Sequence, residues 1–132
     1  MSLEYKVNSP ITAEEVAEVF RASGIKRPVD QLERLQRMID HADIIITVWE
    51  DNKLIGIARA ITDYSYCCYL SDLAVDKGYQ KQGIGKQLIK ELQKQLNEET
   101  SLLLLSAPDA MDYYPRLGFN QLENAFLIPR KR

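Results

Sequence analysis

The sequence predicts an α/β (α+β) domain, in which helices flank a central mixed, mostly antiparallel sheet of about seven strands. Three observations predict it. Apolar residues at helical spacing follow capping residues near positions 12 and 30. Strand-like apolar segments separated by turn residues fill positions 44–75. A loop containing glycines and an amphipathic helix then join two strand-like segments, which favours a right-handed crossover between parallel strands.

The first third of the chain predicts one strand and two helices. Residues 3–8 alternate weakly between apolar and polar side chains, which indicates a strand. Thr12 and Glu15 have the spacing of a capping box, and the helix that follows is predicted to stop at Gly24. Asp30 and Glu33 repeat this spacing and predict a second helix.

The rest of the chain supplies the other strands. A helix beginning near Ile84 connects the strands around Val75 and Leu103, which we expect to be parallel neighbours. A short fourth helix is predicted over residues 110–117. The remaining strands are predicted from apolar segments bounded by turn residues: 44–49, 54–62, 66–75, 102–105, 119–122 and 125–128. The last two segments would close the sheet as a hairpin.

Length and composition limit the classes of function. We expect the 132 residues to form one domain over positions 1–132, with 45% hydrophobic and 27% charged residues. The net charge of −2 argues against a duplex nucleic acid as partner. No apolar segment approaches the roughly 20 residues that cross a bilayer, and the start lacks the apolar part of a signal peptide. Cys67 and Cys68 are adjacent and lack metal-ligand spacing. We therefore expect a cytoplasmic protein with reduced thiols and no metal, nucleic-acid or membrane partner.

The loop before the long helix has the pattern Gln-x-x-Gly-x-Gly, at Gln80, Gly83 and Gly85. Glycines at a strand-to-helix turn let a ligand approach the backbone, and the free amides of the first helical turn favour a phosphate or pyrophosphate. A nucleoside-triphosphate loop would need Gly at position 80 and Ser or Thr at position 87, and both positions are Gln. A dinucleotide fingerprint would need a third glycine where Leu88 stands. A loop that merely opens an ordinary helix is the remaining alternative.

The loop resembles the acetyl-coenzyme A loop of the GNAT superfamily of N-acetyltransferases. A second motif, Tyr114-x-x-x-Gly118-Phe119 with Ala110 four residues before the tyrosine, resembles the superfamily's second signature. The two motifs stand in the superfamily's order, and the resemblance covers residues 44–119. It implies the GNAT fold, acetyl-CoA as cosubstrate, and an acceptor that is a primary amine of a small molecule or an exposed amino group. Dimers are frequent in the superfamily, so a homodimer is a further expectation.

The resemblance also implies which residues bind the cofactor. The backbone of Leu73, Ala74 and Val75 would hydrogen-bond the pantetheine, and amides from Gln82 to Lys86 would hold the pyrophosphate. Lys86 either adds a charge there or is a solvated lysine. The implied set is Leu73, Ala74, Val75, Gln80, Lys81, Gln82, Gly83, Ile84, Gly85, Lys86, Ser106, Ala110, Tyr113 and Tyr114. Many members of the superfamily carry Asn where this chain has Ala107, and Ser106 is expected to replace that amide only in part.

Acetyl transfer needs a neutral amine and a proton donor for the departing thiolate. A tyrosine hydroxyl is protonated at neutral pH and can donate to a thiolate. The resemblance gives this general-acid role to Tyr114, and the alternative is a core tyrosine with a satisfied hydroxyl. For the general base the candidates are Asp72, Asp63 and Tyr69, acting directly or through an ordered water. The alternative for Asp72 is a carboxylate with a structural hydrogen bond.

Two functions are consistent with these motifs. The first is an N-acetyltransferase in which the amine attacks the thioester directly. The second is a non-catalytic module that binds acyl-CoA for sensing or for assembly with a partner. Release of thiol from acetyl-CoA in the presence of amines distinguishes them.

Overall fold

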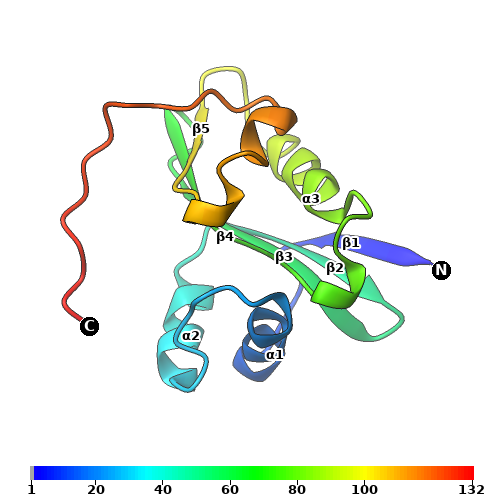
Figure 1. Cartoon of the computed structure of the whole chain (residues 1–132). Helices are drawn as coiled ribbons and strands as arrows, with labels where there is room; N and C mark the ends of the chain where they lie inside the picture. Colours follow the sequence, from blue (N-terminus) through cyan, green and yellow to red (C-terminus); the bar gives the residue numbers. More distant parts are fainter. Residues whose placement is uncertain (1) are drawn as a thin grey trace.

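The computed structural model describes residues 2–132 and places all of its strands in one sheet (Figure 1). The strands follow chain order across the sheet, β1-β2-β3-β4-β5. Neighbours are antiparallel except for β4 and β5, which are parallel, as the sequence predicted. The strands are β1 (Leu3–Val7), β2 (Ile44–Glu50), β3 (Lys53–Thr62), β4 (Cys67–Val75) and β5 (Ser101–Leu104); the α-helices are α1 (Ala13–Ser23), α2 (Leu32–Asp40) and α3 (Ile84–Gln93).

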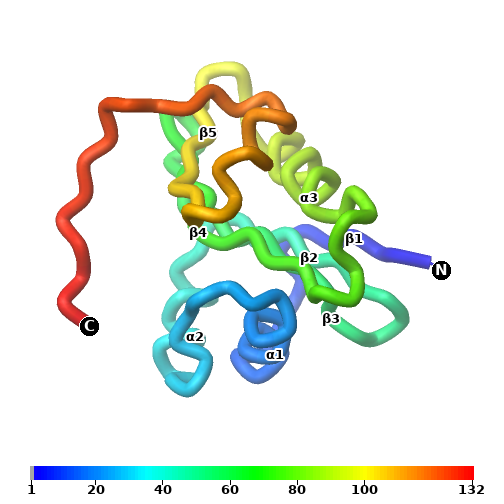
Figure 2. Tube along the Cα trace, in the orientation of Figure 1, coloured from blue at the N-terminus to red at the C-terminus, as the bar shows by residue number. Residues whose placement is uncertain are grey.

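The two faces of the sheet carry separate apolar cores. Helices α1 and α2 lie on one face and α3 lies on the other (Figures 1 and 2). Phe20 and Leu35 are completely buried in the first core, whereas Leu88 and Leu92 are completely buried in the second. The central strands β2 and β3 are covered on both faces, which explains their continuous apolar sequences. The fold is therefore the α/β arrangement that the sequence predicted.

The predicted start and end of α1 are confirmed. The Thr12 hydroxyl accepts a hydrogen bond from the Glu15 amide at 3.1 Å, and the Thr12 amide donates to the Glu15 carboxylate at 2.9 Å. These two bonds satisfy amides that a helix start leaves without partners. The helix stops at Gly24, whose φ of +83° suits a residue without a side chain.

Replacing Thr12 with Ala is expected to lower the free energy of unfolding by about 1 kcal/mol, because the Glu15 amide loses its acceptor. Urea unfolding followed by circular dichroism measures the change. Thr12→Ser keeps a hydroxyl at the same position and is the matched control. Equal losses in the two variants would contradict a role for this hydrogen bond.

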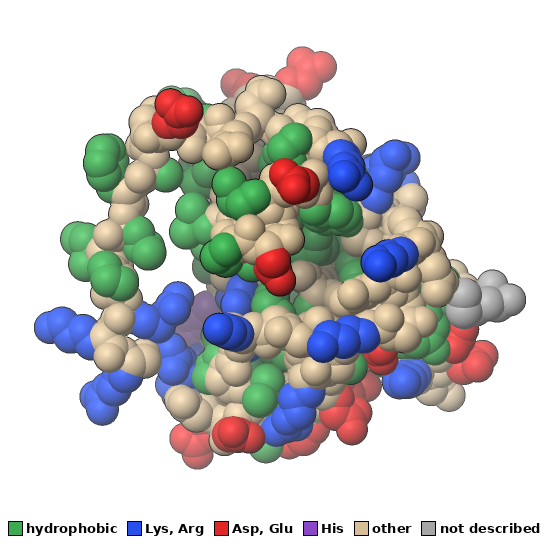
Figure 3. Space-filling model, viewed as in Figure 1, with side chains coloured by type: hydrophobic (Ala, Val, Ile, Leu, Met, Phe, Trp, Pro, Cys, Tyr) green, Lys and Arg blue, Asp and Glu red, His purple; other side chains and the backbone are tan. Residues whose placement is uncertain are grey.

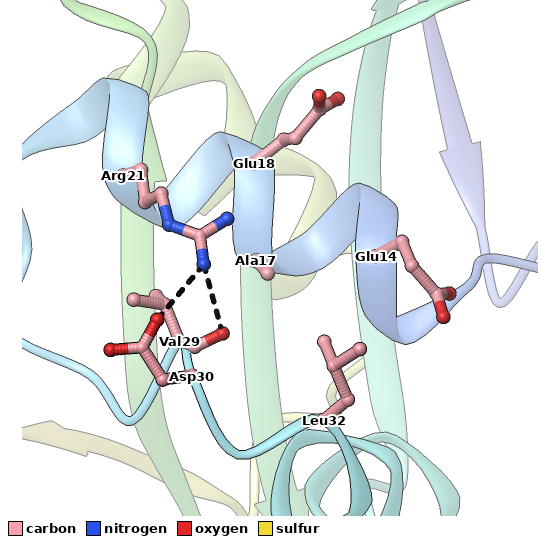
Figure 4. A pocket seen from close by; sticks show the side chains of 7 residues that line it. All are labelled: Glu14, Ala17, Glu18, Arg21, Val29, Asp30 and Leu32. Carbon is pink, nitrogen blue, oxygen red and sulfur yellow. Dashed lines mark hydrogen bonds and ion pairs between the residues drawn. The ribbon is translucent and has the colours of Figure 1, made fainter.

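The predicted cap of the second helix is wrong. Helix α2 begins after Gln31, and no side chain accepts a hydrogen bond from its first amides. The Asp30 carboxylate instead pairs with Arg21 of α1 at 3.2 Å, and the same guanidinium donates to the Val29 carbonyl (Figure 4). The Asp30 carboxylate therefore contacts the Arg21 guanidinium instead of the first amides of α2.

The C-terminal part also differs from the prediction. Residues 119–132 form no strand, so the sheet has five strands and the predicted hairpin of residues 119–122 and 125–128 is absent. Residues 120–132 are all exposed, so this segment buries no apolar face against the sheet that would stabilise a strand. The predicted helix over residues 110–117 is two short 3₁₀ segments, η2 (Pro108–Ala110) and η3 (Tyr114–Leu117), because Pro115 interrupts an α-helix.

Candidate active site

The parallel strands β4 and β5 separate part-way along β4. Their pairing ends at Leu70 and Leu104, after which the chain turns from β5 into η2 while β4 continues to Val75 (Figure 1). Within residues 2–132, this second half of β4 therefore has a strand partner only on its β3 side. The other side is an open sheet edge, available for hydrogen bonds to an extended ligand.

The hydrogen-bond pattern shows which backbone groups face this open edge. Asp76 donates to the Ile55 carbonyl across β3, and antiparallel pairs alternate between bonded and non-bonded residues. Ala74 therefore faces β3, whereas Leu73 and Val75 present their backbone groups to the open side. The Gln80 side chain already donates to the Val75 carbonyl at 2.8 Å. Of the three predicted pantetheine contacts, Leu73 is therefore the one whose N–H and C=O groups are both available on the open side.

After the loop that follows β4, the first backbone amides of α3 have no side-chain hydrogen-bond acceptor. Lys81 and Gly83 both have left-handed backbone conformations, with φ of +66° and +82°. Gly83 is the residue that caps α3, and no side chain there accepts a hydrogen bond from the first turn. The amides of Ile84, Gly85 and Lys86 therefore point out at the positive end of the helix, the arrangement that binds a phosphate group.

Tyr113 lies against this first turn. A Cβ atom placed on Gly85 would be 2.5 Å from the Tyr113 hydroxyl, so the absence of a side chain at position 85 is required for the contact. Burial raises the pKa of Tyr113 above its ordinary value. The predicted loop and the predicted tyrosine motif, which are far apart in the sequence, are therefore in contact.

Tyr114 is half-buried beside Tyr113. Its ring packs edge-on against Tyr113 and Phe119, with centroid distances of 5.1 and 5.7 Å. Burial raises the pKa of the Tyr114 hydroxyl, the neighbouring Tyr113 raises it further, and the positive charge of Arg27 opposes the change. Among the described residues, no hydrogen bond occupies this hydroxyl. Tyr114 is therefore a neutral phenol with a proton to donate.

Asp72 does not have the environment expected of a general base. Its side chain is 0% exposed, and its two carboxylate oxygens accept hydrogen bonds from the Nε atoms of Arg27 and Arg59. A bulge at Ser71 sets this orientation, since the paired residues Arg59 and Ala60 of β3 oppose Asp72 and Leu70 of β4. The structural alternative for Asp72 holds, and we correct the catalytic prediction on this ground.

Asp63, the second candidate, lies in the loop between β3 and β4. One of its carboxylate oxygens accepts hydrogen bonds from the amides of Ser65, Tyr66 and Cys67 at 2.9, 2.8 and 3.1 Å. These bonds lower the pKa of Asp63, which makes it a weaker proton acceptor. Tyr69 lies on β4 in the segment paired with β5, before the strands separate.

After β5, position 107 is alanine, where many members of the superfamily carry asparagine. Ser106 is half-buried, and its hydroxyl donates to the neighbouring Ala107 carbonyl at 2.8 Å. Ala110 ends η2 one turn before the tyrosine pair. Ser106 as a replacement for the missing amide stays a prediction.

Comparison with known proteins assigns the family. A model of the acetyltransferase (GNAT) domain matches residues 8–127. The chain belongs to the GNAT acetyltransferase family. An uncharacterized N-acetyltransferase, ycf52, of Porphyra purpurea is 32% identical over 116 residues, which cover 80% of this chain and 65% of that relative. The chain thus spans slightly less than two thirds of that relative's length.

Solved GNAT structures share the fold. A GNAT-family acetyltransferase from Streptococcus pneumoniae has a TM-score of 0.83 and 24% identity, with 99% of both chains covered. The aminoglycoside N-acetyltransferase AAC(6')-Iy, solved in complex with CoA, has a TM-score of 0.71 and 17% identity, and covers 99% of this chain and 96% of its own. At these identities the likeness shows the fold alone.

Arg27 and Arg59 are site residues of this GNAT chain that the sequence did not reveal. Arg27 comes from the loop between α1 and α2, and its Nη2 also donates to the Ser71 carbonyl at 2.8 Å. Arg59 lies inside β3 with 7% exposure and donates to the Ser71 hydroxyl at 2.9 Å. An arginine within an otherwise apolar strand was the one available signal. Together they fix the bulge of β4 where its open edge begins.

The surface of this GNAT chain carries positive charge around the loop. Lys77, Lys81 and Lys86 are exposed, and lysine and arginine side chains lie over the loop and the start of α3 (Figure 3). Within residues 2–132, no three His, Cys, Asp or Glu side chains are grouped to hold a metal ion. No helix in that range is long and apolar enough to cross a membrane. A hollow of about 350 Å³ between α1 and the following loop shares no residue with the candidate site (Figure 4).

Proposed function

We propose that this chain is an acetyl-CoA-dependent N-acetyltransferase that acetylates a primary amine of a small molecule or an exposed amino group. The observation that carries the proposal is the convergence of three features: the open edge of β4, the uncapped start of α3, and the hydroxyl of Tyr114. The CoA complex of AAC(6')-Iy, which shares the fold, supports the choice of cosubstrate.

Each feature suits one part of the cosubstrate. The amides of residues 84–86 match the pyrophosphate, and the exposed lysines around the loop add positive charge. The backbone of Leu73 faces the open edge, where it matches the amides of the pantetheine. Binding along this edge directs the thioester toward the end where β4 and β5 separate.

Transfer then follows from the chemistry of a neutral amine. The amine nitrogen attacks the thioester carbonyl carbon, the new N–C bond forms, and the C–S bond breaks. The Tyr114 hydroxyl donates its proton to the departing thiolate and regains one from solvent. We assign the proton lost by the amine to water, because the Asp72 carboxylate is enclosed by Arg27 and Arg59 and backbone hydrogen bonds lower the pKa of Asp63.

The test measures binding and turnover separately. Isothermal titration calorimetry with acetyl-CoA measures binding, and a thiol-release assay with a panel of primary amines measures transfer. We expect saturable binding and amine-dependent release of thiol. Binding without release for every amine would favour the non-catalytic acyl-CoA module, and absence of binding would exclude both functions. A cytoplasmic location stays a prediction from the sequence.

Replacing Gly83 with Glu is expected to weaken acetyl-CoA binding by at least about tenfold, because a carboxylate at the cap of α3 repels the pyrophosphate and competes for the amides. Calorimetry gives the dissociation constants. Gly83→Ala is the matched control, since it imposes the same strain at φ +82° without adding charge. Normal binding by the Glu variant would contradict the role of the loop.

A further inference from the structure

The ion cluster at the bulge of β4 carries a net positive charge. Within residues 2–132, the ion pairs of Arg27 and Arg59 are both made with the single carboxylate of Asp72. Two positive charges therefore meet one negative charge, and one positive charge is left without a counter-ion. A charge taken out of water in this way is costly unless a partner of opposite sign is supplied.

Arg27 is the member of the cluster that a ligand can reach. Its side chain is 28% exposed, whereas those of Arg59 and Asp72 are 9% and 0% exposed. The three nitrogen atoms of Arg27 each donate one hydrogen bond, to the Asp72 carboxylate, the Lys26 carbonyl and the Ser71 carbonyl. A guanidinium has five N–H donors, so one donor on each terminal nitrogen has no acceptor among the described residues. Two donors on a planar group suit the two oxygens of a carboxylate.

Arg27 borders the place where the thioester is expected. The loop between α1 and α2, which carries Arg27, lies below β4 in Figure 1, and η2 lies above β4. The Ser71 carbonyl that Arg27 binds is one residue after Leu70, where the pairing of β4 with β5 ends. Arg27 therefore lies at the end of the open edge toward which the thioester is directed.

The proton donor Tyr114 is exposed to the same charge. Burial raises the pKa of the Tyr114 hydroxyl, and the positive charge of Arg27 opposes that rise. Interactions between charges weaken with distance, so the guanidinium and the hydroxyl are near each other. The attacking amine must also come close to this hydroxyl, because the thioester carbonyl carbon is bonded to the departing sulfur. The acceptor therefore reacts beside Arg27.

The other charged residues of the loop do not cancel the charge of Arg27. Lys26 is exposed and adds a second positive charge. Asp30 is the only acidic residue between positions 24 and 31, and its carboxylate pairs with Arg21 at 3.2 Å. A counter-ion for the cluster must therefore come from a ligand.

This charge favours one class of acceptor over others. It repels a protonated amine or a polycation, whereas a carboxylate on the acceptor supplies the missing counter-ion and accepts the free N–H groups. On the basis of the proposed acetyl transfer, we propose that the acceptor is a small primary amine that carries a carboxylate, and that Arg27 binds this carboxylate.

Thiol release with matched amines tests the proposal on the unmodified chain. Glycine, β-alanine and 4-aminobutyrate are each compared with the amide of the same acid, which has the same length and no negative charge. Values of kcat/KM are expressed per neutral amine, so that differences between the pKa values of the amines do not enter. We expect at least one acid to be preferred over its amide by about tenfold or more.

Substitution of Arg27 connects this preference with one side chain. Arg27→Gln leaves a neutral pair of Arg59 and Asp72 and is expected to abolish the preference. Arg27→Lys keeps the charge without the planar group of donors, and is expected to lower the preference several-fold. Lys26→Gln is the matched control, because it removes the neighbouring exposed charge and is expected to keep the preference. Circular dichroism verifies that each variant is folded.

The outcomes separate this proposal from the proposed function. Equal kcat/KM values for every acid and its amide in the unmodified chain would overturn the carboxylate specificity and leave acetyl transfer intact. So would a preference that is unchanged in Arg27→Lys or in Arg27→Gln, or one that Lys26→Gln abolishes equally. Absence of thiol release with these amines and with the wider amine panel would exclude acetyl transfer itself, and this acceptor with it.

Discussion

Replacing Tyr114 with Phe is expected to lower kcat for acetyl transfer by about 10²–10⁴-fold, while the dissociation constant of acetyl-CoA stays nearly unchanged. Phe keeps the ring contacts with Tyr113 and Phe119 and removes only the hydroxyl. That hydroxyl is needed when the thiolate departs, so its loss affects the transition state rather than binding. Initial rates of thiol release and calorimetry separate the two quantities.

Tyr113→Phe is the matched control for this substitution. The two tyrosines are adjacent and both have raised pKa values, but the Tyr113 hydroxyl faces Gly85. We expect the control to keep most of the wild-type kcat. Equal losses in both variants, or an unchanged kcat in Tyr114→Phe, would exclude Tyr114 as the acid.

The pH dependence of kcat gives an independent check of Tyr114 as the general acid. The pKa of Tyr114 is raised, chiefly by burial, so the hydroxyl stays protonated and able to donate up to pH values above its ordinary pKa of about 10. We therefore expect no loss of kcat from this group on the alkaline side below about pH 10. The raised pKa would be contradicted if the kcat of the unmodified enzyme fell near pH 8 and this fall disappeared in Tyr114→Phe.

The parts of the fold that were predictable from the sequence have local signals. The ends of α1 follow from Thr12, Glu15 and Gly24, whose hydrogen bonds and backbone angles involve only neighbours in sequence. The start of α3 follows from Gly83 in the same way. The parallel pairing of β4 and β5 follows from the helix between them, because the handedness of such crossovers is nearly fixed.

The parts that were not predictable depend on partners distant in sequence. Asp30 and Glu33 have the spacing of a capping box, yet the Asp30 carboxylate accepts a hydrogen bond from Arg21 of α1 instead. Residues 125–128 have apolar side chains suited to a strand, but strand formation requires an edge to pair with. Residues 125–128 pair with no strand, so their apolar pattern alone did not predict their structure.

The candidate site likewise has one part that the sequence predicted and one part that it did not. Its backbone features, the loop and the open edge, follow from glycines and strand order. Its ionic part does not, because Arg27 and Asp72 are 45 residues apart and no spacing rule connects them. The carboxylate that the sequence offered as a base is instead the centre of a buried ion cluster, which holds β4 against the α1–α2 loop.

Replacing Asp72 with Asn is expected to lower the free energy of unfolding by about 3–5 kcal/mol. The substitution removes the only negative charge from a cluster in which Arg59 is 7% exposed, and two guanidinium groups then lie close together without a counter-ion. Urea unfolding at neutral pH measures the loss, which is large relative to the stability of a typical domain.

Asp30→Asn is the matched control for the buried cluster. It also breaks an Arg–Asp pair, the one between Arg21 and Asp30, but the Asp30 side chain is 93% exposed. Pairs in water contribute little, so this variant is expected to lose less than about 1 kcal/mol. A difference of this size would arise because Asp72 is buried and pairs with two guanidinium groups, whereas Asp30 is exposed and pairs with one. If Asp72→Asn unfolds at the same urea concentration as Asp30→Asn, the cluster does not stabilise the junction of β4 with the α1–α2 loop, and the positions of Arg27 and Ser71 must depend on other contacts.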